Sequence, residues 1–205
     1  ACQDELGYFS EALKSYETAL NLNPKFSEVH LNIGNVCRNQ GEFGLAVQAY
    51  QTALEINPGL EKAHNNLGVC FREMRRFDDA LSALEDAVVA KSNYPEAYYN
   101  IASVYQEMGL FEQAISNYRK ALGLQPDYDD AYANMGVCLK NIGKIDQAIK
   151  SFDKAISINP DHAKSHKNLS FIFLQKGMYE KGLDKYEWRW ATDELSGDRR
   201  YFEQP

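Results

Sequence analysis

An asparagine recurs every 34 residues along the sequence and forms its most regular polar feature. This column, named the Asn ladder below, consists of Asn32, Asn66, Asn100, Asn134 and Asn168. A carboxamide both donates and accepts hydrogen bonds, so it can pair through two bonds with a peptide backbone. Asparagine is also a poor helix former that usually lies exposed, so packing does not easily explain such a row. The ladder therefore predicts binding of an extended polypeptide irrespective of its sequence. The alternative is that each asparagine satisfies a backbone group of the neighbouring 34-residue unit.

Cysteines and histidines could hold a metal, but their spacing does not favour it. Cys70 and Cys138 occupy the same position in units two apart, so a stacked array would keep them from pairing. The sequence has no CxxC motif and no close Cys/His pair, and His30, His64 and His166 recur with the 34-residue period. A recurring histidine is typical of a packing position, and such cysteines are typical of buried side chains in a reducing compartment. We expect no metal and no cofactor.

Signatures of catalysis are missing from the sequence. It contains no P-loop, no GxSxG elbow and no HExxH helix, and no pair of carboxylates stands out for acid–base work. We therefore expect this chain to have no catalytic site of its own.

The same period runs through the residues that shape helices. Prolines lie at Pro24, Pro58, Pro126 and Pro160, with Ser92 in the missing place. Glycines lie at Gly7, Gly41, Gly109, Gly143 and Gly177, with Arg75 in the gap. Alanines and aromatic residues alternate between them, as at Ala46, Tyr50 and Ala53. Proline cannot continue a helix, and glycine supplies the positive φ that ends one. Each unit is therefore predicted to be two helices joined by a turn, and we expect the turns at Arg75 and Ser92 to be looser.

This pattern resembles the tetratricopeptide repeat family over nearly the whole chain. The residues that carry the resemblance are typified by Ala63, Leu67, Gly68, Phe77, Ala80 and Ala87. The resemblance implies an all-α fold, an α-α superhelix or solenoid of about five and a half helix-turn-helix repeats, whose first helices line a concave groove. The expected units are a partial repeat at 1–26, complete repeats at 27–60, 61–94, 95–128 and 129–162, an atypical terminal repeat or cap at 163–196, and a tail or linker at 197–205. Because the first unit is incomplete, we expect the chain to be a piece of a longer protein.

Polar residues beside the Asn ladder are expected to add selectivity in this groove. Helical spacing places there Asn35, Arg38, Asn65, Arg72, Tyr99, Lys140 and Lys167. Chaperone-binding members of the family use a Lys/Asn/Arg set to hold a terminal carboxylate. Leu31, Glu96 and Asn100 occupy positions which that set needs, so a chaperone C-terminal peptide is not the expected ligand.

The end of the sequence departs from the repeat. Gly182 and Arg189 replace its alanines, and both tryptophans lie within 186–190. One interpretation is that the tryptophans cover the open end of the core. The other is a resemblance: Tyr186 to Trp190, a polar stretch and then Phe202 to Pro205 are similar to the junction in bacterial proteins where a repeat array continues into a glycosyltransferase-like domain.

Composition narrows the classes of partner. The 205 residues include 22 Lys and Arg against 29 Asp and Glu, a net charge of −7, so the sequence lacks the basic face of a nucleic-acid-binding protein. No run of about 18 apolar residues predicts a transmembrane helix, and no export leader is visible. We expect no membrane insertion and a cytoplasmic location.

These observations together predict an interaction scaffold. Its partner is expected to be a protein or peptide, bound as an extended chain by the Asn ladder. Two alternatives stay open: a substrate-presenting arm of a larger glycosyltransferase-like enzyme, and a structural scaffold that assembles into homo-oligomers.

Overall fold

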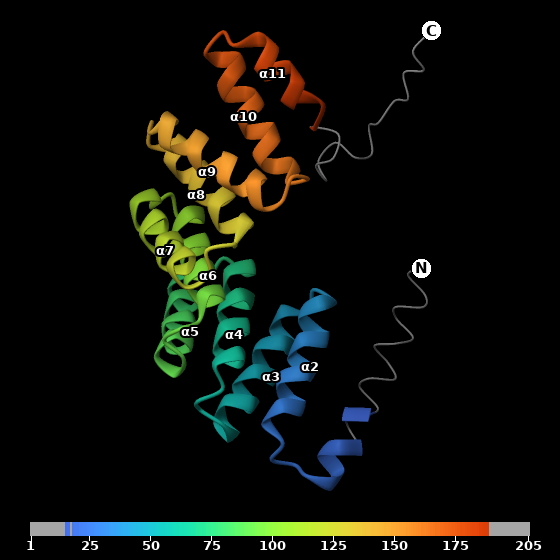
Figure 1. Cartoon of the computed structure of the whole chain (residues 1–205). Coiled ribbons are helices and arrows are strands. Elements are labelled where there is room, and N and C mark those ends of the chain that lie inside the picture. Colours follow the sequence, from blue (N-terminus) through green and yellow to red (C-terminus); the bar gives the residue numbers. More distant parts are fainter. Residues whose placement is uncertain (1–14, 17, 189–205) are drawn as a thin grey trace, which may run out of the picture. The chain divides into compact units, whose positions relative to one another are not determined.

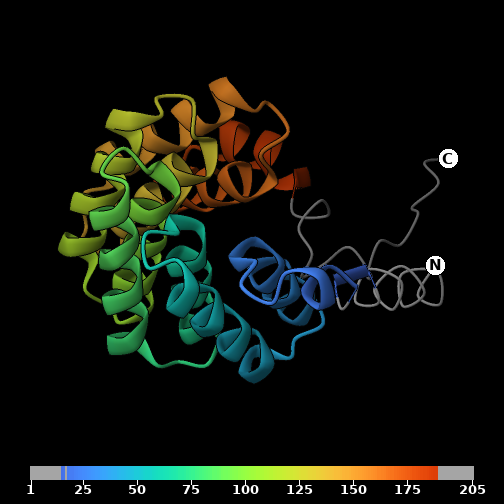
Figure 2. The ribbon, with the colours of Figure 1, turned by 90° about the horizontal axis from the view of Figure 1, so that it is seen from below.

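The computed structural model describes residues 15–16 and 18–188, and every regular element in this part of the chain is a helix (Figures 1 and 2). Residues 15–16 and 18–22 are helical. The helices that follow are α2 (Ser27–Asn39), α3 (Phe43–Ile56), α4 (Glu61–Glu73), α5 (Phe77–Ala90), α6 (Pro95–Glu107), α7 (Phe111–Leu124), α8 (Asp129–Asn141), α9 (Ile145–Ile158), α10 (Ala163–Gln175) and α11 (Tyr179–Tyr186). The predicted all-α class of helix-turn-helix repeats is confirmed.

The chain forms two compact units, residues 1–104 and 105–205. In the first unit, α2 packs on α3, α3 on α4 and α4 on α5, and α2 also contacts α4. In the second unit, α7 packs on α8, α8 on α9, α9 on α10 and α10 on α11, and α8 also contacts α10. Within each unit, therefore, alternate helices lie close enough for their side chains to interact.

The repeating alanines and large residues form the core of each helix pair. Ala46, Tyr50 and Ala53 on α3 are fully buried, and so are the corresponding Ala148, Phe152 and Ala155 on α9. The large side chain lies against a glycine of the first helix: a Cβ atom added at Gly34 would lie 2.5 Å from the Tyr50 ring, and one at Gly136 would lie 2.7 Å from the Phe152 ring. In these two pairs the first helix presents a bare backbone because an aromatic ring fills the space that a side chain would need.

The turn at Arg75 has the same backbone geometry as the glycine turns. Arg75 has φ 58°, and Gly41 at the equivalent turn has φ 78°. The Arg75 N–H donates to the Arg72 carbonyl at 2.8 Å, as the Gly41 N–H donates to the Arg38 carbonyl at 3.0 Å. The prediction of a looser turn at Arg75 is therefore wrong, because the closing hydrogen bonds hold a non-glycine residue in the left-handed region. At Ser92 the change is different: the proline has moved to Pro95, the first residue of α6, where its missing N–H costs nothing.

The recurring histidines have a packing role at the turns that contain Pro58 and Pro160. The His64 Nε2 atom lies 2.8 Å from the carbonyl oxygen of Pro58, and the His166 Nε2 atom lies 2.8 Å from that of Pro160. Each ring thus supplies a donor to a turn carbonyl. The Trp188 ring stacks on His166 with 4.3 Å between centroids, which agrees with the covering role expected for the tryptophans, whereas Trp190 and residues 191–205 lie outside the described part.

Among the described residues, no helix is both long enough and apolar enough to span a bilayer.

Candidate functional site

Four asparagine side chains of the first unit are joined in one hydrogen-bonded series, named the amide chain below. The Asn66 Nδ2 atom donates to Asn35 Oδ1 at 2.8 Å, Asn65 Nδ2 donates to Asn66 Oδ1 at 3.2 Å, and Asn100 Nδ2 donates to Asn65 Oδ1 at 2.9 Å. The series runs from α6 through α4 to α2. It therefore connects the first helices of three successive repeats.

The positions of these side chains follow from the helix packing. Asn35 lies on α2, Asn65 and Asn66 are neighbours on α4, and Asn100 lies on α6. Asn65 is 7% exposed, whereas the other three side chains are half-buried. A buried amide needs hydrogen-bond partners, and Asn65 finds them in Asn66 and Asn100. Asn65 therefore acts as a buried relay between two amides that reach solvent.

Tyr50 closes the amide chain at its α2 end. Its hydroxyl group donates to Asn35 Oδ1 at 2.9 Å and also interacts with Asn66, so both amides are tied to the buried side of the repeat. Burial raises the pKa of Tyr50, with a smaller opposite effect from the charge of Arg38. The phenol thus stays neutral and serves as a donor.

The amide chain leaves part of each ladder amide available. A carboxamide has two N–H groups and two oxygen lone pairs. On Asn66, the bond to Asn35 uses one N–H group, and the bond from Asn65 uses one lone pair of the oxygen. On Asn100, the contact to Asn65 uses one N–H. Because a carboxamide has two N–H groups and two lone pairs, these three contacts leave both amides with an N–H and a lone pair that the contacts do not use, and two-point pairing with a peptide unit requires one of each. The contacts of Asn66 and Asn100 reach the neighbouring repeat, as in the structural alternative stated from the sequence, but their partners are side-chain amides and not backbone groups.

The ladder residues of the second unit have a different environment. The Lys140 Nζ atom donates to Asn168 Oδ1 at 2.7 Å, and Asn168 Nδ2 donates to the Lys164 carbonyl of its own helix at 2.8 Å. Burial lowers the pKa of Lys140. Asn134 on α8 is half-buried. The predicted residues Lys140 and Asn168 are thus brought together, but the Asn168 amide is engaged on both of its polar atoms.

The other predicted residues lie on the first helices without joining the amide chain. Asn32 on α2, Tyr99 on α6 and Lys167 on α10 are half-buried. The Arg72 Nη2 atom pairs with Glu73 Oε1 at 2.7 Å. Arg38 lies near enough to Tyr50 and Cys70 for its charge to lower the pKa of both groups, although burial still raises that of the Cys70 thiol to about 11. A thiol so far from ionisation at neutral pH is a packing group.

A similar tyrosine–amide contact occurs in the second unit. The Tyr118 hydroxyl donates to Gln106 Oε1 at 2.9 Å, and the Cys138 thiol donates to the same oxygen at 3.3 Å. Burial raises the pKa of Cys138 to about 12. Here the amide oxygen is shared by a hydroxyl and a thiol, whereas Asn35 Oδ1 is shared by a hydroxyl and a second amide.

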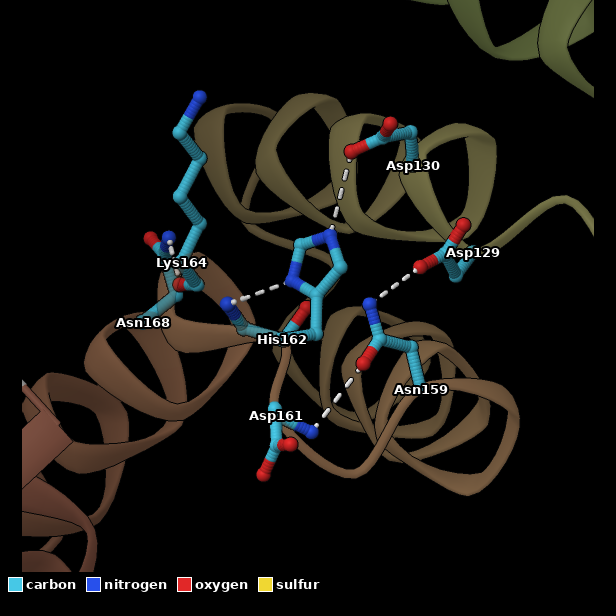
Figure 3. Close-up of polar contacts among 8 residues, drawn as sticks. Asp129, Asp130, Asn159, Asp161, His162, Lys164 and Asn168 are labelled. Carbon is cyan, nitrogen blue, oxygen red and sulfur yellow. Dashed lines mark hydrogen bonds and ion pairs between the residues drawn. The ribbon is translucent and has the colours of Figure 1, made fainter. Parts of the chain in front are cut away.

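A polar cluster at the turn between α9 and α10 was missed by sequence reasoning (Figure 3). His162 Nε2 lies 3.2 Å from Asp130 Oδ1, and His162 Nδ1 accepts from the Ser165 N–H at 3.2 Å. The Asn159 Nδ2 atom donates to Asp129 Oδ2 at 2.8 Å. The hydrogen bond to Asp130 raises the pKa of His162, and His162 holds the pKa of Asp130 below its usual range.

This cluster fastens the turn to the first turn of α8. One sequence signal could have revealed it: His162 stands in the column that elsewhere holds Phe26, Leu60, Tyr94 and Tyr128. A polar residue in an apolar column indicates a specific partner, because burying it unpaired would cost free energy.

Comparisons with known proteins agree with the fold. The family model described as Tetratricopeptide repeat matches residues 27–60, 95–128 and 129–162, and a second model described as TPR repeat matches residues 5–37. No curated protein is significantly similar to the chain.

Several solved structures are similar to it. MamA is 26% identical with a TM-score of 0.69, covering 82% of this chain and 98% of that one. PilF of Pseudomonas aeruginosa is 20% identical with a TM-score of 0.81, covering 96% and 93%. YrrB, described as a TPR protein with an unusual peptide-binding site, is 21% identical with a TM-score of 0.66, covering 89% and 96%. Since the two family models together match more than half of its residues, the chain belongs to the tetratricopeptide repeat family.

Proposed function

We propose that this protein is an interaction module that binds an extended polypeptide on the face of α2, α4 and α6 occupied by the amide chain. The observation that supports it most directly is the hydrogen bonding of Asn66 and Asn100 within the amide chain, where these three bonds use only part of the donors and acceptors of each amide. Two-point pairing with backbone groups does not depend on side chains. The module therefore accepts many sequences, provided that they are extended.

The preorganisation of the amides favours this function. An isolated exposed asparagine must give up side-chain freedom when it binds a ligand, and that loss reduces affinity. Here Asn65 and Tyr50 already fix the orientation of the neighbouring amides. YrrB, whose fold is similar, is described as having a peptide-binding site, and this is consistent with such a use of the fold.

The experiment is a selection followed by a binding measurement. A phage-displayed library of random, unconstrained peptides is panned against the protein, and the selected peptides are measured by fluorescence anisotropy. We expect binders without a shared sequence motif. Asn100→Ala removes the solvent-side end of the amide chain and should weaken binding about tenfold, the equivalent of about 1.4 kcal/mol.

The matched control is Asn141→Ala on α8. Asn141 is exposed and donates to the Val137 carbonyl of its own helix, so its loss leaves the amide chain intact. Equal affinity of Asn100→Ala and wild type, with unchanged circular dichroism, would exclude the amide chain as the binding surface.

The two other functions named from the sequence remain proposals. The glycosyltransferase junction depends on Trp190 and Phe202 to Pro205, which lie outside the described residues. Identifying the sequence that follows Pro205 in the gene tests it directly. Self-assembly is tested by sedimentation over a concentration series, where a concentration-independent monomer would contradict it.

A further inference from the structure

We infer that the amide chain imposes one direction on its ligand, so that an extended peptide binds with its amino end toward α6 and its carboxyl end toward α2. This inference rests on the proposed function and adds to it a polarity that peptide binding alone does not require. Its basis is the shared orientation of the amides at Asn66 and Asn100.

Both amides point their nitrogen atoms the same way. Asn66 Nδ2 faces Asn35 on α2, and Asn100 Nδ2 faces Asn65 on α4. The Asn66 oxygen faces the opposite way, toward the Asn65 amide that in turn accepts from α6. Asn66 also interacts with the Tyr50 hydroxyl, which lies beside Asn35 and therefore on the same side as its nitrogen. On each ladder amide the donor thus lies nearer α2.

A reversal of either amide would break the chain. If Asn66 turned over, its oxygen would face the oxygen of Asn35, and its nitrogen would face the donating nitrogen of Asn65. Two contacts would change from attractive to repulsive. Hydrogen bonds arranged in series also strengthen one another, and this adds to the preference for one arrangement. The bonds to Asn35 and Asn65 therefore tie the orientation of Asn66 to that of its neighbours before any ligand binds.

The direction of the peptide follows from the stereochemistry of two-point pairing. An extended residue presents its N–H and its C=O on the same side of the strand, with the N–H nearer the amino end. The peptide C=O must lie against the amide nitrogen, which is on the α2 side. The peptide N–H must lie against the amide oxygen, which is on the α6 side. A peptide in the opposite direction would bring donors against donors at both Asn66 and Asn100.

Photo-crosslinking tests the direction. Two pools of short peptides of randomised sequence are prepared, one with a benzophenone amino acid at the first position and one with it at the last. After irradiation with the full chain, crosslinked residues are identified by mass spectrometry. We expect the last-position pool to label α2 around Asn35 and the first-position pool to label α6 around Asn100. The reversed pattern, or the same pattern from both pools, would overturn the inference.

The outcome also separates this inference from the proposed function. Crosslinks to this face without end preference contradict the direction and leave peptide binding supported. An absence of crosslinks on this face contradicts the proposed function itself, and the direction with it.

A relay variant links the direction to the amide chain. Asn65→Leu removes the bonds to Asn66 and Asn100 while keeping a similar volume, so the end preference should disappear. If circular dichroism shows that this variant is unfolded, Asn65→Asp replaces it, since a carboxylate accepts from Asn100 but has no N–H for Asn66. Asn141→Leu is the control, and it should keep the preference. An end preference equal to that of wild type in a folded Asn65 variant would refute the role of the amide chain.

Discussion

The Tyr50 hydroxyl donates a hydrogen bond to the Asn35 carboxamide oxygen across 2.9 Å, and so joins a fully buried ring on α3 to the polar face of α2. The same oxygen accepts from Asn66 on the next repeat. One atom thus connects the core of one repeat to the ladder residue of another.

Tyr50→Phe removes this donor while keeping the ring. Because the Asn35 oxygen retains Asn66 as a partner, we expect a loss of only about 1 kcal/mol in the free energy of unfolding. Urea denaturation measures it. Tyr179→Phe on α11 is the control, because Tyr179 is exposed and its substitution should change little. A loss as large as that of a cavity-forming substitution would mean that the ring itself has been displaced.

Gly34→Ala places a methyl group where the Tyr50 ring lies, 2.5 Å from the nearest ring atom. We expect a loss of about 1–3 kcal/mol, since α2 and α3 must separate or the ring must leave its rotamer. Gly44→Ala on α3 is the matched control, because nothing lies within 4 Å of the added atom. In this helical position alanine should stabilise by about 0.5–1 kcal/mol. Thermal unfolding of both variants measures whether stability falls in Gly34→Ala and rises in Gly44→Ala. A stabilising Gly34→Ala would contradict the close packing.

Arg75→Gly removes the side chain of the one described non-glycine residue that has a positive φ. A left-handed conformation costs an L-residue about 1–2 kcal/mol. Glycine removes this cost, but the substitution also removes a stabilising cation–π contact, because the Arg75 guanidinium lies 5.3 Å from the centre of the Phe77 ring. We therefore expect Arg75→Gly to stabilise by about 1 kcal/mol in urea denaturation. Gly143→Ala, at the equivalent turn with φ 76°, should do the reverse. Destabilisation by Arg75→Gly would mean that the arginine side chain outweighs the backbone cost.

The pair formed by His162 and Asp130 predicts a pH-dependent stability. The pKa of His162 is raised, so its contribution is present below the unfolded value near 6.5 and is lost as the pH rises through the folded value. The pKa of Asp130 is lowered, so its contribution is present above the unfolded value near 3.8 and is lost as the pH falls through the folded value. The stability difference between wild type and Asp130→Asn should thus be largest in mildly acidic solution and should shrink toward alkaline pH.

Two features moderate this effect. Asp130 is well exposed, so solvent screens the pair, and protonation of His162 ends the acceptance by Nδ1 from the Ser165 N–H. Proton NMR of His162 measures its pKa directly, and His166 provides an internal comparison, because burial lowers its pKa instead. A difference between wild type and Asp130→Asn that is independent of pH would contradict the ion pair.

The sequence alone determined the helix-turn-helix class and the polar face of the first helices. The period of proline, glycine and alanine is a local property, and in repeat proteins each unit contacts only its neighbours, so local patterns suffice to predict the fold. The same pattern singled out Asn66 and Asn100 as ladder residues and Asn35 and Asn65 as their neighbours.

Only the tertiary structure decided how these residues are connected. Asn65 bonds to both Asn66 and Asn100, whereas Asn168 bonds to Lys140 and to its own helix. Residues at equivalent positions thus differ in their partners. Whether a hydrogen bond forms between two helices depends on differences of a few tenths of an ångström in the distance between donor and acceptor. Spacing along the chain does not specify such distances. Arg75 makes the same point for the backbone, since the hydrogen bonds of its turn, and not its residue type, hold it in the left-handed conformation.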